Sequence, residues 1–178
     1  KRNESSYLKQ VVEKVETILD TMETRYYNGN YYHTYPQARP DRISYNCLIN
    51  AYTKCDEEDY SDKVEAVLEK MNALSENAAA SSSPDDREYG LLVHPDTTTY
   101  NSITNFYASR KNDSQAAQRC EDLLMIQSEL SNESNNIQMD TTSFNIVLKA
   151  WSNSGQGIDG AQRAESLLQM MKKLHNNG

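Results

Sequence analysis

The stretch Pro40-Asp41-Arg42-Ile43-Ser44-Tyr45-Asn46 decides the fold, because the chain writes it three times. It returns as PDTTTYN at residues 95–101 and, lightly altered, as MDTTSFN at residues 139–145. Each copy is followed by an aliphatic-rich run that ends in an aromatic residue: Tyr52, Tyr107 or Trp151. Self-similarity at intervals of tens of residues is typical of solenoids, which stack one supersecondary unit. We therefore expect function to lie on a surface built by repetition.

Each copy is predicted to begin an amphipathic helix. In the first copy Tyr45, Leu48, Ile49 and Tyr52 follow the i, i+3, i+4, i+7 spacing of one helical face, and the other two copies repeat it. The Asp or Thr near each start is available to cap free backbone amides. A second helix follows each first one, and the first, fourth, fifth and eighth residues of its copies are expected to pack: residues 64–71, 120–127 and 164–171, with an orphan copy at 15–22.

The spacing inside each hairpin is nearly fixed, whereas the connections between hairpins vary in length, as stacked helical pairs allow. We divide the chain into a partial repeat with a Tyr-rich connection, a repeat with a Ser/Ala-rich insertion, and two further repeats: residues 7–39, 40–94, 95–138 and 139–178. The insertion at residues 75–84 is predicted to be disordered. The missing first helix of the orphan copy is expected upstream, extending in part into the segment of Tyr7 and Leu8, and the sequence is interpreted as a piece of a longer protein.

The net charge and the hydropathy of the chain argue against two classes of protein, generic phosphate binders and membrane-spanning proteins. The formal net charge is −8, which argues against generic phosphate binding, since that usually shows as a basic patch. It leaves open the recognition of single-stranded RNA through base edges and stacking. No stretch approaches the roughly 18 apolar residues that span a bilayer, so we predict no transmembrane helix and no membrane partner.

Catalytic and metal-binding motifs are not recognisable. Cys47, Cys55 and Cys120 are odd in number and widely spaced, so they suggest neither a disulfide framework nor a metal cluster. We expect Cys47 and Cys120 to be buried, reduced thiols within helices. The sequence has no Gly-rich phosphate loop, no paired-carboxylate motif, and no nucleophile or ligand spacing around its histidines: His33, His94 and His175. We therefore predict no enzyme activity, no cofactor and no metal site.

The repeated phrase resembles the pentatricopeptide repeat family. Its opening, P-D-x-x-x-Y-N-x-L-I-x-x-Y, stands at residues 40–52 and is recognisable at 95–107 and 140–151. The family's A-x-x-x-x-x-M tail of the second helix is clearest at residues 164–171, and the resemblance covers residues 7 to 174. The connections are longer than the family's, and Met139 replaces Pro in the third opening. The resemblance implies an all-α solenoid: a right-handed superhelix of helix-turn-helix hairpins, with the first helices on the concave face.

The resemblance also implies a function, in which each repeat reads one base of single-stranded RNA with two or three side chains. One reader is the Asn after the aromatic, and its partner is the residue at the junction with the next repeat, which the resemblance carries onto the Asp of the next opening. This pairs Asn46 with Asp96 and Asn101 with Asp140. Asp41 would serve an upstream Asn, and the partner of Asn145 would lie beyond the last residue. The resemblance further implies organellar RNA processing, stabilisation or translation, in a mitochondrion or plastid.

Asn and Asp together suit uracil, because an Asn amide can donate to a carbonyl oxygen while a carboxylate accepts the N3–H. The family likewise implies a uridine preference. Its base-sandwiching position holds Ile43, Thr98 and Thr142, and its phosphate-contacting positions hold Lys54 and, approximately, Arg110.

Two alternatives remain open. The recurring Asp residues could serve only as helix caps, and the Asn residues only as solvated helix positions. A protein-binding solenoid of the same shape would fit the acidic charge and the few phosphate-facing cations.

Overall fold

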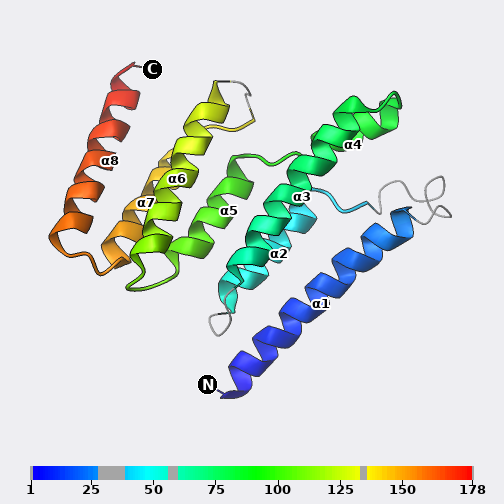
Figure 1. Cartoon of the computed structure of the whole chain (residues 1–178), viewed down its shortest axis with the longest axis horizontal. Coiled ribbons are helices and arrows are strands. Elements are labelled where there is room, and N and C mark those ends of the chain that lie inside the picture. The colour runs from blue at the N-terminus through cyan, green and yellow to red at the C-terminus, as the bar shows by residue number, and fades with distance from the viewer. Residues whose placement is uncertain (1, 28–38, 56–59, 133–135, 178) are drawn as a thin grey trace. The chain divides into compact units, whose positions relative to one another are not determined.

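The computed structural model describes residues 2–27, 39–55, 60–132 and 136–177. These residues form helices and hold no strand, so the all-α prediction is confirmed at that level (Figure 1). The Tyr-rich connection lies mostly outside the described residues. In chain order the helices are α1 Arg2–Tyr27, α2 Arg42–Lys54, α3 Ser61–Ala80, α4 Pro84–Val93, α5 Thr97–Ala108, α6 Ser114–Ser131, α7 Thr141–Asn153 and α8 Ile158–Asn177.

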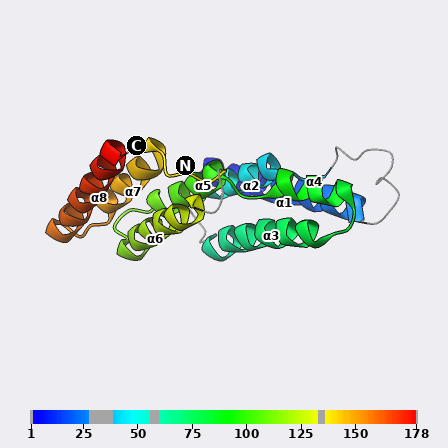
Figure 2. The same cartoon turned by 90° about the horizontal axis from the view of Figure 1, so that it is seen from above.

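The helices fall into two compact units, Lys1–Pro95 and Asp96–Gly178. In the first unit α1 packs on α2, α2 on α3, and α3 on α4. In the second unit α5 packs on both α6 and α7, α6 on α7, and α7 on α8. Figure 2 shows α3 and α4 running side by side within the first unit. No helix in the described parts of the chain is long and apolar enough to cross a membrane.

A capping box begins each of the three first helices, α2, α5 and α7. The Asp at the N-cap accepts the backbone N–H of the residue three positions on, whose hydroxyl in turn accepts the backbone N–H of the Asp. The predicted caps are thereby confirmed. The three pairs, with their N–H to carboxylate distances, are Asp41 and Ser44 at 2.9 Å, Asp96 and Thr99 at 2.9 Å, and Asp140 and Ser143 at 2.7 Å.

The predicted packing stripes form the core of the inner helices. The first-helix stripe of α2 is buried, as are the four stripe residues of both α3 and α6. In the outermost helix of each unit the prediction is only partly right, because Ile18 on α1 is 60% exposed and Leu168 on α8 is 43% exposed. α1 packs mainly on α2, and α8 mainly on α7, so one neighbour covers only part of each stripe.

The prediction of a disordered Ser/Ala-rich insertion is wrong. α3 continues through Ala80, since Ala is the strongest helix former, and an additional helix, α4, starts with Pro84 in its first turn. Gly90 allows α4 to approach α3 closely, because a Cβ atom there would lie 2.8 Å from the Cβ of Ala78. The assignment of Tyr7 and Leu8 to a separate helix is also wrong: both lie within α1, which is continuous.

α4 is anchored beside the start of α2. The Tyr89 hydroxyl donates to the carbonyl oxygen of Pro40 at 3.1 Å, and Arg42 donates to the carbonyl oxygen of His94 at 3.2 Å. The guanidinium of Arg39 lies 4.5 Å from the centre of the Tyr89 ring and 3.4 Å from the carboxylate of Asp86. The insertion thus belongs to the packed structure of the first unit.

The three cysteines differ in burial. Cys55 and Cys120 are buried, but Cys47 is exposed, so its predicted burial is wrong: it follows Asn46 on α2 outside the stripe that packs. Burial raises the pKa of the Cys120 thiol to about 12. Its Sγ also lies 3.3 Å from the carbonyl oxygen of Thr104.

We expect Cys47 to be the first thiol to react with a chromogenic thiol reagent in native buffer at pH 7 to 8. Cys120 should react only on unfolding, because the thiolate is the reacting species and its pKa lies far above this pH. Mass spectrometry of the labelled protein would identify the sites, with Cys47→Ser as the control. Native labelling of Cys120 at the rate of Cys47 would contradict the packing described here.

Candidate nucleic-acid interface

Three polar residues of the second unit form a hydrogen-bonded group, which we call the Asn101 cluster: Asn101, Asp140 and Ser143. The Asn101 Nδ2 lies 3.4 Å from Asp140 Oδ1, and the Ser143 Oγ lies 2.8 Å from Asn101 Oδ1. The same hydroxyl is 2.9 Å from Asp140 Oδ1. The structure therefore brings together the Asn and Asp of one predicted reading pair, and adds a serine that the sequence prediction did not include.

Packing of α5 against α7 brings the cluster together. Asn101 lies in the second turn of α5, while Asp140 caps α7 and Ser143 lies in its first turn. The connection that precedes α7 is tied to the start of α5: Thr97 N–H donates to the carbonyl oxygen of Asn136, and the Thr97 hydroxyl accepts the N–H of Gln138 at 2.8 Å. These bonds hold the N-terminus of α7 against α5. Asn101 and Asp140, the predicted reading pair, therefore meet only once the two helices have packed.

The Asp140 carboxyl is stabilised in its charged form. Partial burial works against ionisation, but it is outweighed by hydrogen bonds from the backbone and side chain of Ser143, from Asn101 and from the backbone of Thr142, so the pKa lies below its usual value. Asp140 is therefore a carboxylate at neutral pH and can only accept hydrogen bonds.

The cluster can offer one donor and one acceptor to a ligand. The Asn101 amide directs one Nδ2 proton to Asp140, and its second proton remains for another acceptor. The bonds to Asp140 from Ser143 N–H, Ser143 Oγ and Asn101 Nδ2 all go to Oδ1, which leaves acceptor capacity at Oδ2. A ligand edge that presents an acceptor beside an N–H donor complements this arrangement.

Within the described part of each unit, the other predicted base-reading residues are not seen in a pair of this kind. Asn46 is buried in α2, with 8% of its surface exposed, and its Oδ1 has no hydrogen-bond partner among the described residues. Asp96, its expected partner, belongs to the other unit, so each is described only within its own. Asp41 caps α2, and Asn145 is exposed on α7.

The predicted base-sandwiching residues share one local position, the second residue of each first helix, and all are exposed: Ile43, Thr98 and Thr142. Ile43 is 69% exposed although its side chain is aliphatic. An exposed β-branched side chain that stands one residue before each capping-box hydroxyl offers an apolar surface next to a polar pair.

The predicted phosphate contacts are few. Lys54 is the exposed last residue of α2. Arg110 follows α5, and its guanidinium lies 4.9 Å from the centre of the Phe106 ring and 5.8 Å from that of Tyr107. Arg110 thus already takes part in cation–π contacts within the protein.

Two glutamates at the second position of the second-helix segments, Glu16 and Glu121, form a repeated contact that the sequence prediction did not include. Glu121 on α6 accepts from the indole N–H of Trp151 at 2.9 Å and pairs with Arg163 on α8 at 3.4 Å. Glu16 on α1 does the same with Tyr52 and Lys63, each at 2.7 Å. The shared element is an aromatic at the end of a first helix. The recurrence of Glu in the sequence was the available signal.

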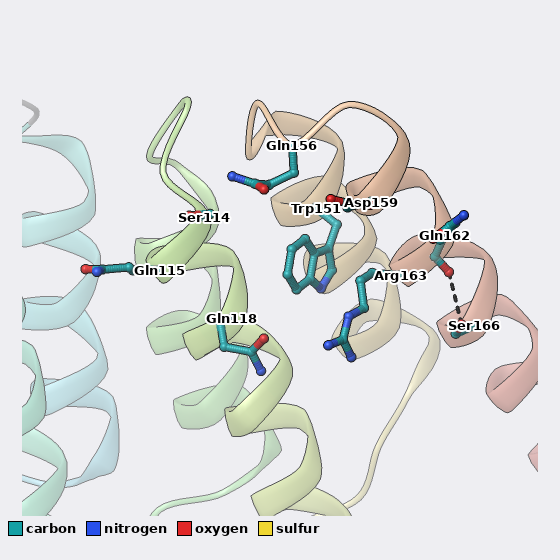
Figure 3. Close-up of a pocket in the computed structure, with 9 residues that line it drawn as sticks. All are labelled: Ser114, Gln115, Gln118, Trp151, Gln156, Asp159, Gln162, Arg163 and Ser166. Atoms are coloured by element: carbon teal, nitrogen blue, oxygen red, sulfur yellow. Dashed lines mark hydrogen bonds between the residues drawn. The ribbon is translucent and has the colours of Figure 1, made fainter.

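An open cavity of about 710 Å³ lies beside the Trp151 contact, between α6 and α8 (Figure 3). Figure 3 shows Arg163 from α8 next to the Trp151 indole, with Gln118 projecting from α6. Amide and hydroxyl side chains dominate the lining, which consists of Ser114, Gln115, Gln118, Trp151, Gln156, Asp159, Gln162, Arg163 and Ser166. The described residues hold no group of His, Cys, Asp and Glu arranged to bind a metal ion.

We expect Glu121→Ala to lower the free energy of unfolding by about 1–2 kcal/mol, because it leaves the buried Trp151 N–H unpaired. Urea unfolding followed by fluorescence of Trp151, the chain's single Trp, would measure this. Glu165→Ala is the matched control, since Glu165 occupies the equivalent but exposed position on α8. Equal effects of the two substitutions would show that the Glu121 contact contributes nothing.

The lowered pKa of Asp140 predicts a pH dependence. A carboxyl whose folded pKa lies below its unfolded value of about 3.9 stabilises the fold above that pH, and the contribution disappears as pH falls through the folded pKa. The difference in unfolding free energy between wild type and Asp140→Asn should therefore shrink as pH falls from 6 to 3. Asn retains good capping ability, so capping itself is preserved. A difference independent of pH would contradict this assignment.

Comparison with models of known protein families, with curated proteins and with solved structures found no match for this chain. The resemblance therefore depends on the repeated phrase in the sequence. The Asn101 cluster is an independent, structural observation that bears on the same residues.

Proposed function

We propose that the chain is a pentatricopeptide-like right-handed solenoid that binds single-stranded RNA, one repeat per base, with a preference for uridine. The observation that carries this proposal is the pairing of Asn101 with Asp140, which come from successive repeats and lie 3.4 Å apart through Nδ2 and Oδ1. The family resemblance implies that this pair reads a base, and α5–α7 packing supplies the contact. The biological setting is RNA processing, stabilisation or translation in a mitochondrion or plastid.

Uracil complements the pair chemically. One of its carbonyl oxygens accepts from Asn101 Nδ2, and its N3–H donates to Asp140, directly or through water. Cytosine and adenine instead present a ring-nitrogen lone pair at the position of the N–H, and this lone pair would face the Asp140 carboxylate. Guanine offers the same acceptor and donor order as uracil at O6 and N1–H, so preference for uracil over guanine follows from the family resemblance and is tested separately.

The exposed Ile43, Thr98 and Thr142 side chains supply the apolar surfaces between which bases lie. Each stands beside a capping box, so the backbone that carries it is fixed. Because stacking contributes about 1–3 kcal/mol per base, a few repeats of this kind give weak binding, and the affinity grows with the number of bases read.

The second candidate function is a protein-binding helical scaffold. The net charge of −8 favours a basic protein partner over a polyanion. Among the described residues α4 has no counterpart in the other repeats, and it exposes the neighbouring Leu91 and Leu92. Binding to RNA distinguishes this candidate from the proposed function.

We expect fluorescence anisotropy at near-physiological salt to show weak binding of the whole chain to U-rich RNA, and weaker binding to A-rich and C-rich RNA. Asn101→Ala should lower the affinity for U-rich RNA about 5- to 10-fold, which corresponds to the loss of roughly 1 kcal/mol. Asn105→Ala is the matched control, because Asn105 lies one turn further along α5 and contacts Lys149.

Equal affinity for U-rich and A-rich strands would overturn the base-reading mechanism. Absence of binding to every strand, with helical structure verified by circular dichroism, would overturn RNA binding by this chain and favour the protein scaffold.

A further inference from the structure

We infer that Ser143 is a positioning residue for base selection: its hydroxyl binds the Asn101 amide oxygen, so that the amide presents its N–H donor to the base in preference to its acceptor. The inference rests on the proposed function and deepens it, because it names the residue that makes the reading pair selective. Ser143 belongs to the repeat that follows Asn101, so the amide of one repeat is oriented by the first turn of the next.

The Ser143 hydroxyl is fixed by its surroundings. Ser143 is 1% exposed, and its Oγ accepts the backbone N–H of Asp140 at 3.3 Å as part of the capping box. The hydroxyl proton is then directed at two oxygens, Asn101 Oδ1 at 2.8 Å and Asp140 Oδ1 at 2.9 Å. The capping box that begins α7 therefore also supplies a donor for the amide oxygen of α5.

The orientation of the Asn101 amide follows from the chemistry of its two partners. Asp140 is a carboxylate and can only accept, so it requires the Nδ2 side of the amide. Turning the amide over would place Oδ1 against the carboxylate, oxygen facing oxygen. Ser143 completes the arrangement, because its hydroxyl donates to Oδ1 and occupies one of the two lone pairs of the amide's acceptor.

Loss of this hydroxyl should change which bases are accepted. A released Oδ1 can accept from an exocyclic amino group, the donor that cytosine, adenine and guanine carry and uracil lacks. The wild-type cluster disfavours this interaction, because the Ser143 hydroxyl already donates to Oδ1, whereas a cluster without the hydroxyl permits it. Ser143 thus contributes to discrimination more than to affinity for the preferred base.

The first arm of the test needs no RNA. The side-chain ¹⁵N–¹H resonances of Asn101, assigned in the whole chain by comparison with Asn101→Ala, report the environment of the amide. Ser143→Ala should shift them and speed the exchange of their protons with water, while Ser143→Thr should preserve them, because Thr99 fills the same capping-box position of α5. Unchanged Asn101 resonances in Ser143→Ala would overturn the inference.

The second arm measures binding to RNAs that differ only in whether the central base is U, C, A or G. In Ser143→Ala the U-to-C and U-to-A affinity ratios should fall about 3- to 10-fold, and Ser143→Thr should restore them. Ratios that stay at the wild-type values would overturn the inference. If the wild type binds no RNA, the proposed function fails, while the resonances still decide whether Ser143 orients the amide.

A matched control separates positioning from helix capping. Ser44 makes the same capping box with Asp41 at the start of α2. Ser44→Ala should cost similar stability and leave the Asn101 resonances unchanged; a shift of those resonances as large as that in Ser143→Ala would contradict the specific role. Should Ser143→Ala unfold, Ser143→Cys keeps nearly the same volume with only a weak donor and should show the same changes in reduced size.

Discussion

The Asp at the start of each first helix is the constraint on which the other features depend. Its carboxylate accepts the backbone N–H three residues on, and its backbone N–H returns a bond to that residue's hydroxyl. This pair of hydrogen bonds fixes the residue at which α2, α5 and α7 begin, and hence the register of each packing stripe. At α7 the same carboxylate also meets Asn101 of the preceding repeat. At α7 one residue therefore links the local start of a helix to the contact with the preceding repeat.

The sequence predicts most of the fold because periodic burial leaves a periodic pattern. Each stripe of apolar residues identified its helix, and the stripes are buried in α2, α3 and α6. The errors have a common cause. The Ala and Ser residues after Ser75 show no apolar period, yet Ala favours helix and the small pair Ala78 and Gly90 lets α4 approach α3. Such a contact depends on two segments that meet only in the folded chain, so neither segment reveals it alone.

Two of the three residues of the candidate site were predicted from the sequence, and the third was not. The family resemblance implied that Asn101 and Asp140 form a pair, and the structure places them in contact. It did not predict Ser143, because that hydroxyl was already explained by the capping box and its second bond exists only once α5 and α7 have packed. The contact of Glu121 with Trp151 was not predicted either, because it forms only once α6 and α7 have packed. A recurring polar residue at a helix surface looks solvated in sequence, and only packing shows which neighbour it serves.

The acidic charge follows partly from this construction. Each first helix uses an Asp to begin, and Glu16 and Glu121 bind the aromatic residues that end first helices. These carboxylates therefore make hydrogen bonds within the fold, and Lys63 and Arg163 form ion pairs with Glu16 and Glu121. Under the proposed function, such a protein recognises RNA through short, directional hydrogen bonds and stacking, next to helix starts that the capping boxes fix. The precise orientation of one amide then matters more for recognition than the sign of the net charge.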